Sequence, residues 1–130
     1  MIFLGIDYGN NKIGLAVGDT DSKFAQPLTV VRYIDEEKAI EKISNYAKIE
    51  RAEKLILGIS EGLTAQKTED FGRKLKNSIK LPVVYHDETL TTHEAQELSK
   101  NAGIKRKKRR EGEDSYAASL ILQNYLELNY

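Results

Sequence analysis

Two short apolar runs at the N-terminus, separated by a turn sequence, constrain the fold of this chain most strongly. The runs Ile2–Ile6 and Ile13–Val17 are apolar or β-branched, and "DYGNNK" lies between them. This pattern is typical of a β-hairpin. The stretch Gln26–Tyr33, "QPLTVVRY", has its proline near the start, where a missing N–H group costs a strand little. The chain is therefore predicted to open with three antiparallel strands.

After these strands the pattern changes to alternating helices and strands. Apolar residues at helical spacing mark the helices, and continuous apolar runs mark strands that are buried on both faces. The predicted elements are a helix Asp35–Arg51, a strand Lys54–Ile59, a loop "SEGLTAQ", a helix Thr68–Ile79, a strand Leu81–His86, a helix from the capping box "TTHE" at Thr91 to Ala102, and a helix Ser115–Leu128. The order βββαβαβαα predicts one α/β domain over residues 1–130, with a five-stranded mixed sheet and helices on both faces.

The composition is typical of a folded domain without disulfides. The 130 residues are 40% hydrophobic and 31% charged and include no cysteine. No apolar run approaches the roughly 20 residues that span a bilayer, so we expect a cytoplasmic protein with no membrane partner. The 20 basic and 20 acidic residues sum to zero but are segregated, because Lys105–Arg110 reads KRKKRR and "EGED" follows directly.

Acidic side chains stand where predicted strands end or helices begin. Asp7 closes the first strand, Glu61 follows the fourth, Glu88 follows the fifth, and Asp114 opens the last helix. The first, fourth and fifth strands are predicted to be parallel, so these acids should meet at one edge of the sheet, where ligands collect in such folds. Converging carboxylates repel unless a hard cation neutralises them, and oxygen ligands suit Mg²⁺ or Mn²⁺.

Four ordered motifs extend this interpretation to a known family. Together, "GIDYGNNKIGLAVGD", "LGISEG", "HDETLTTHEA" and "EDSYAASLILQNYL" resemble the YqgF-like family, whose members are described as Holliday junction resolvases or as pre-ribosomal-RNA nucleases. The resemblance covers nearly the whole chain and implies a ribonuclease-H-like fold. It implies that Asp7, Glu88 and Asp114 are the catalytic and metal-binding acids. Glu61 is the nearest candidate for an alternative acid after the fourth strand.

Two positions depart from the pattern of that family. An arginine is usual after "DE", where this chain has Thr89, and a proline is usual after the fourth strand, where this chain has Ser60. The first departure removes a phosphate contact and the second alters a loop near the site. The substrate preference of the family is therefore not carried over with the acids.

The resemblance also implies hydrolysis of phosphodiester bonds with two Mg²⁺ or Mn²⁺ ions. The basic run Lys105, Arg106, Lys107, Lys108, Arg109 and Arg110 is predicted to be a loop between Gly103 and Gly112 that contacts phosphates without reading sequence. Lys12 and Arg73 are weaker candidates for additional phosphate contacts. Tyr8, next to Asp7, is a candidate for stacking on a base.

Each acid also has an ordinary structural interpretation when it is taken alone. Asp7 can be a turn residue, Asp114 can cap the last helix, and Glu88 can be a solvated loop residue. The hypotheses for function are a nuclease for the precursor of small-subunit ribosomal RNA, a resolvase for branched DNA, and a nonenzymatic nucleic-acid-binding module. A resolvase is expected to need a homodimer, whereas an RNA-trimming enzyme can act as a monomer. An ATP-binding role, suggested by the first hairpin alone, ranks last because 130 residues leave no room for a second domain.

Overall fold

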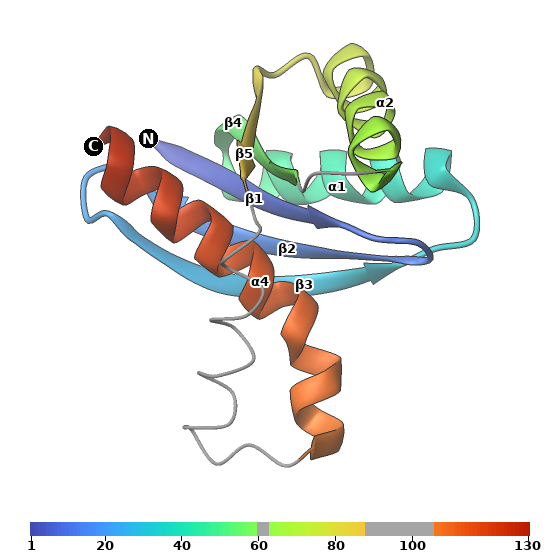
Figure 1. Cartoon of the computed structure of the whole chain (residues 1–130). Helices are drawn as coiled ribbons and strands as arrows, with labels where there is room; N and C mark the ends of the chain where they lie inside the picture. Colours follow the sequence, from blue (N-terminus) through green and yellow to red (C-terminus); the bar gives the residue numbers. More distant parts are fainter. Residues whose placement is uncertain (60–62, 88–105) are drawn as a thin grey trace.

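The computed structural model describes residues 1–59, 63–87 and 106–130. The predicted alternation of strands and helices is confirmed over these residues (Figure 1). The elements are β1 (Ile2–Tyr8), β2 (Lys12–Asp19), β3 (Phe24–Arg32), α1 (Glu36–Glu50), β4 (Ala52–Ile59), α2 (Leu63–Ile79), β5 (Val83–Asp87) and α4 (Arg106–Asn129). The predicted helix from Thr91 to Ala102 lies outside the described residues.

The five strands form one mixed sheet in the order β3-β2-β1-β4-β5. β1 pairs antiparallel with β2, and β2 pairs antiparallel with β3, which confirms the predicted meander. β1, β4 and β5 are parallel, so their carboxyl ends lie at the same edge of the sheet. β1 is the central strand, held by a ladder on each side.

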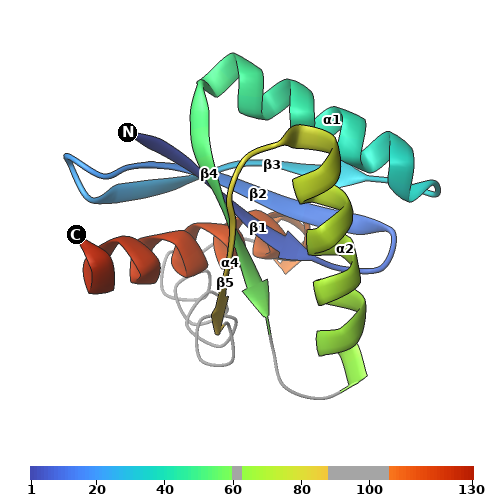
Figure 2. The ribbon, with the colours of Figure 1, turned by 90° about the horizontal axis from the view of Figure 1, so that it is seen from above.

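The helices cover both faces of the sheet, as predicted from the element order (Figures 1 and 2). α1 and α2 pack on one face, over a core that includes Leu4 and Ile6 of β1. α4 packs on the other face, over a core that includes Phe3 of β1. Because side chains alternate along a strand, Gly5 and Asp7 belong to the face of α4.

Glycines on this second face allow the backbone of α4 to lie close to the sheet. A Cβ atom at Gly5 would come within 2.7 Å of the Ala118 carbonyl oxygen, and one at Gly18 within 2.8 Å of the Leu122 Cδ2 atom. At both positions the absence of a side chain makes room for the helix. The distance between α4 and the sheet is therefore set by residues that contribute no side chain of their own.

Two helices begin earlier than the sequence pattern predicts. α2 begins at Leu63 rather than Thr68, and α4 begins at Arg106 rather than Ser115. The predicted loop between Gly103 and Gly112 is therefore wrong for residues 106–112. Lysine, arginine and glutamate are good helix formers, and a single interior glycine costs only about 1 kcal/mol. Gly112 therefore does not interrupt the helix.

Candidate active site

Asp7 lies near the end of the central strand, on the face covered by α4. Its side chain is half-buried. In the antiparallel ladder Asp7 is directly opposite Gly14 of β2. Residues paired in this way have Cα atoms about 4.5–5.5 Å apart and side chains on the same face. Asp7 is thus paired with β2 and follows directly after the last pair of the β1–β4 ladder, Ile6 with Leu57.

Asp114 lies on α4 above the same glycine. A Cβ atom built at Gly14 would overlap the carbonyl group of Asp114, so the helix backbone rests directly on this point of β2. Gly14 is thus the common neighbour of Asp7 and Asp114, which are 107 positions apart in the sequence. The structure brings together these two predicted acids.

The interpretation of Asp114 as a helix cap is wrong. α4 begins at Arg106, so Asp114 lies about two turns inside the helix. An aspartate in a helix interior is a weak helix former and gains nothing there from capping.

Lys12 supplies a positive charge beside Asp114. Its Nζ atom is 3.2 Å from the Asp114 Oδ2 atom, and both side chains are partly exposed, at 43% and 27%. An ion pair as exposed as this contributes about 0–1 kcal/mol to stability. The pair matters more for the local charge, because it places a cation at the edge of the acidic pair. Lys12 was predicted to contact phosphates, and the structure places it at the acids.

The turn between β1 and β2 is fastened to the end of β3. The Tyr33 hydroxyl donates to the Gly9 carbonyl oxygen at 2.7 Å, and the Tyr33 amide donates to the Asn11 carbonyl oxygen at 2.9 Å. Asn11 has a φ of 68°, a left-handed conformation that asparagine adopts more readily than most residues. The turn that follows Asp7 is therefore held from outside the hairpin, by contacts that no local sequence pattern predicts.

Tyr8 belongs to the opposite face from Asp7, and its predicted role in stacking on a base is wrong. Its ring stacks on Phe71 with centroids 4.4 Å apart, and its hydroxyl donates to the Glu36 Oε2 atom at 3.2 Å. Burial, followed by the neighbouring Tyr33 and Glu36, raises the pKa of Tyr8 above its ordinary value. Arg73 also lies away from the acids, paired with Asp70 on α2.

Several predicted site residues are placed only by the strand or helix that precedes or contains them. β4 ends at Ile59 and β5 at Asp87, so Glu61 and Glu88 follow these parallel strands but lie outside the described residues. Lys105 also lies outside them. Arg106, Lys107, Lys108, Arg109 and Arg110 form the first turns of α4.

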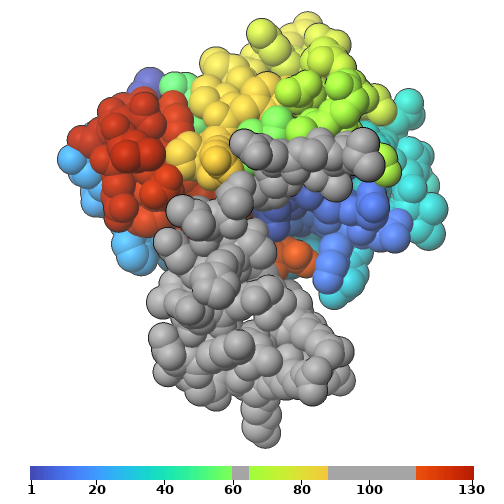
Figure 3. Space-filling view, in the orientation of Figure 1, coloured from blue at the N-terminus to red at the C-terminus, as the bar shows by residue number. Residues whose placement is uncertain are grey.

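The carboxyl end of β5 is tied to α4. The His86 Nε2 atom is 2.6 Å from the Asn124 Oδ1 atom, and the His86 ring meets the Tyr125 ring edge-on at 5.9 Å. Figure 3 shows the surface of β5 beside that of the C-terminal half of α4. His86 therefore joins β5 to α4 through its two contacts.

Asp7 and Asp114 have side chains of the type that binds a hard cation. Both supply carboxylate oxygens, the ligands that Mg²⁺ and Mn²⁺ prefer. Among the side chains that the structure describes, no three acids, histidines or cysteines gather closely enough to hold a metal ion. The two aspartates match such an ion in ligand type, and within the described residues no third ligand joins them. Within the described residues, no helix is long and apolar enough to cross a membrane.

Solved structures of the same fold place the chain in a known structural class. *Thermus thermophilus* RuvC in complex with a Holliday junction substrate aligns with a TM-score of 0.64 at 15% identity, covering 98% of this chain and 95% of the other. The fowlpox virus Holliday junction resolvase aligns with a TM-score of 0.62 at 14% identity, covering all of both chains. The fold is ribonuclease-H-like, as the motif resemblance implied.

Sequence comparisons define the family within that class. The chain belongs to the RuvX family, whose model is described as a Holliday junction resolvase and matches residues 1–128. A *Lactococcus lactis* protein named "Putative pre-16S rRNA nuclease" is 37% identical, covering 95% of this chain and 92% of the relative. A *Syntrophus aciditrophicus* protein of the same name is 38% identical, covering 98% and 89%. These findings confirm the resemblance and the prediction of a nuclease.

Proposed function

We propose that this chain is a metal-dependent nuclease that hydrolyses phosphodiester bonds in structured nucleic acid and processes the precursor of small-subunit ribosomal RNA. One observation carries the proposal: Gly14 holds Asp7 of β1 and Asp114 of α4 beside the same point of the sheet. The names of the relatives, which refer to pre-16S rRNA, support the choice of substrate. Such a substrate implies a cytoplasmic location.

Asp7, Glu88 and Asp114 are the proposed catalytic and metal-binding residues, with Glu61 as the alternative acid. Two Mg²⁺ or Mn²⁺ ions, when bound, would activate water and stabilise the departing oxygen of an in-line displacement. Asp7 is suited to orient such ions because a central strand fixes it more firmly than a loop can. Lys12 limits the repulsion between Asp114 and its acidic neighbour in the absence of a bound cation.

The basic segment Lys105–Arg110 is proposed to hold the phosphate backbone. Five of its residues precede Asp114 on α4 itself. At a rise of 1.5 Å per residue, Arg110 lies about 6 Å and Arg106 about 12 Å from Asp114 along the helix axis. A strand whose scissile phosphate lies at Asp114 would therefore pass these residues, and its binding should weaken as salt concentration rises.

The proposal is tested by incubating the purified chain with precursor 16S rRNA and with a four-way DNA junction, with and without Mn²⁺. We expect Mn²⁺-dependent cleavage of the RNA and at least a 100-fold loss in Asp7→Asn, which corresponds to about 2.7 kcal/mol of transition-state stabilisation. The control variant is Asp70→Asn, an exposed acid on α2. Binding of RNA without cleavage under any divalent ion would leave only the nonenzymatic module.

The second candidate function is resolution of Holliday junctions, which the description of the family model favours. A four-way junction has twofold character, so a resolvase would act as an isologous dimer. Cleavage of the junction but not of the RNA, together with a dimeric mass in sedimentation, would replace the first proposal with this one. If the chain is a monomer and cleaves the RNA but not the junction, the resolvase function is excluded.

A further inference from the structure

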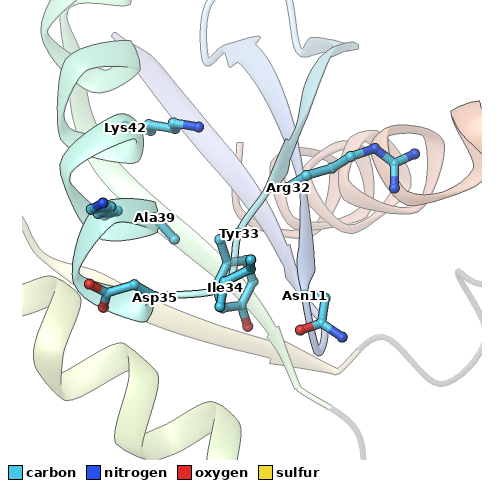
Figure 4. A pocket seen from close by; sticks show the side chains of 8 residues that line it. Asn11, Arg32, Tyr33, Ile34, Asp35, Ala39 and Lys42 are labelled. Carbon is cyan, nitrogen blue, oxygen red and sulfur yellow. The ribbon is translucent and has the colours of Figure 1, made fainter.

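A cationic groove runs along the outer edge of the sheet, beside the β1–β2 turn that follows Asp7. Its main part is a pocket of about 710 Å³ between the end of β3, the start of α1 and Asn11 (Figure 4). A second hollow of about 480 Å³ shares Arg32 and Lys42 with this pocket and extends it along β3 and α1. We call the two together the edge groove.

Three cations line the edge groove: Arg32 of β3 and Lys38 and Lys42 of α1. All three are exposed, and among the side chains that the structure describes none of them forms an ion pair. Asp35 is the acid in the lining, and its carboxylate accepts from the Glu37 amide at 3.0 Å as the cap of α1. The edge groove therefore has a net positive charge available to a ligand.

The register of the sheet links the edge groove to the two acids. Arg32 is directly opposite Lys12 in the β2–β3 ladder, so the two side chains leave the sheet on the same face. Lys12 in turn contacts Asp114. Because β3 is the last strand of the sheet, no further strand separates Arg32 from the lysines of α1. Lys12 and Arg32 thus lie on the face of α4, and the lysines of α1 lie on the other side of the edge strand; Figure 4 shows Arg32 directed toward α4 and Lys42 directed from α1 toward β3.

The edge groove also offers apolar surface. Ile34 is 101% exposed at its mouth, and the half-buried ring of Tyr33 forms part of its wall. Apolar and aromatic side chains beside cations suit an unstacked strand, whose bases and phosphates are both accessible. A duplex presents mainly its backbone and would leave Ile34 and Tyr33 without contacts.

We propose that the edge groove binds a single-stranded RNA segment flanking the scissile bond, with phosphates at Arg32, Lys38 and Lys42 and a base against Ile34 and Tyr33. This inference rests on the proposed function, since it assumes that Asp7 and Asp114 mark the cleavage site. If the edge groove binds such a segment, the enzyme should prefer a duplex that carries a single-stranded extension over a blunt duplex.

The test compares RNA binding by two charge-matched triple variants in an Asp7→Asn background. The groove variant is Arg32→Ala, Lys38→Ala, Lys42→Ala, and the control is Lys48→Ala, Lys67→Ala, Lys76→Ala, which removes three exposed cations outside the edge groove. Fluorescence anisotropy measures affinity for a blunt RNA hairpin and for the same hairpin with a single-stranded extension, at several salt concentrations.

We expect the groove variant to lose at least tenfold in affinity for the extended RNA and little for the blunt RNA. The slope of log affinity against log salt should fall by about 2, because each phosphate contact to a single strand contributes about 0.7. Equal behaviour of the two triple variants on the extended RNA, or an equal loss on the blunt RNA, would overturn the inference. If the groove variant melts at a lower temperature than the control, Arg32→Gln and Lys42→Gln singly provide the same comparison.

Cleavage separates this inference from the proposed function. The cleavage experiment uses the protein with its native Asp7. If this protein cleaves no RNA, although affinity for RNA depends on the edge groove, the nuclease proposal fails and the binding site stands. If it cleaves blunt and extended RNA equally well and the groove variant has no effect, the edge groove is not an RNA site and the nuclease proposal stands. An edge groove that bound an acidic protein instead would give this second result.

Discussion

At the scale of single residues, Gly14 decides whether Asp7 and Asp114 can work together. It carries no atoms that could block α4, and the carbonyl group of Asp114 occupies the space of its missing side chain. A backbone atom cannot move aside as a side-chain tip can. The position of one acid relative to the other is thus fixed by a residue without functional groups.

Gly14→Ala should displace the N-terminal half of α4 and remove activity. We expect the free energy of unfolding to fall by about 1–3 kcal/mol, the range for overpacking a tight site. The matched control is Gly18→Ala, on the same strand and face, where the new methyl group meets the tips of Leu122 and Leu126. Urea denaturation and RNA cleavage would be measured on both variants. Full cleavage by Gly14→Ala would show that the close contact is dispensable.

Tyr8 should make the stability of the protein depend on alkaline pH. Burial raises the pKa of Tyr8 in the folded chain above the ordinary value of about 10. Between the unfolded and the folded pKa, the unfolded chain releases a proton that the folded chain retains. The contribution is complete below about pH 10 and is lost as pH rises further.

The measurement for Tyr8 is the free energy of unfolding in urea at about pH 9 and about pH 11. The wild-type chain should lose more stability over this interval than Tyr8→Phe. Burial also raises the pKa of Tyr85, but that residue is present in both proteins and its effect cancels in the comparison. Identical losses in the two proteins would mean that the Tyr8 hydroxyl titrates normally in the fold.

At the scale of elements, Tyr33 fastens the turn that follows Asp7. Tyr33→Phe removes the hydrogen bond to Gly9 and should cost about 0.5–1.5 kcal/mol of stability. The control is Tyr85→Phe, which removes a hydrogen bond from a hydroxyl to the carbonyl oxygen of Glu69 at the opposite edge of the sheet. Amide hydrogen exchange of residues 9–11 and RNA cleavage should both change in Tyr33→Phe only. Unchanged exchange there would show that the turn is held without this bond.

The order and type of the described elements could be predicted from the sequence because each follows from local pattern. The apolar runs of β1 and β2, the turn sequence between them and the helical spacing within α1 depend on residues that are near in the sequence. The start of α4 was missed because Gly112 was treated as a break within a charged segment of good helix formers. In this segment the lysine, arginine and glutamate residues favour a helix, whereas Gly112 indicates a loop. The structure has a helix there, as the helix propensities predict.

The candidate site was predictable in its acids but not in its geometry. Asp7 is marked by its place at the end of an apolar run, and Asp114 by its family motif. Gly14 and Arg32 carried no such mark, because their roles depend on the pairing of β2 with β1 and β3. Glycines at 5, 14 and 18 on one face were the signal that a helix lies close to the sheet. The three glycines can be assigned to one face only when the pairing of the strands is known.

At the scale of the whole molecule, the two faces of the sheet differ in the residues that they carry. The face of α1 and α2 carries the larger core, and the face of α4 carries the acids. A net charge of zero does not oppose nucleic-acid binding, because the basic residues are placed locally, at the start of α4 and along the edge groove. The acids and the cations that would hold a substrate thus meet at one end of a rigid sheet.

The most direct test of the account is whether Asp7 and Asp114 share a bound divalent cation. Electron paramagnetic resonance of Mn²⁺ would measure its affinity for the wild-type chain, Asp7→Asn, Asp114→Asn, the double variant and the control Asp70→Asn. Each single variant should bind at least tenfold more weakly, and the double variant should lose less than the sum because the two residues act on one site. Wild-type affinity in both single variants, or independent and additive losses, would contradict the claim that these acids form one metal site.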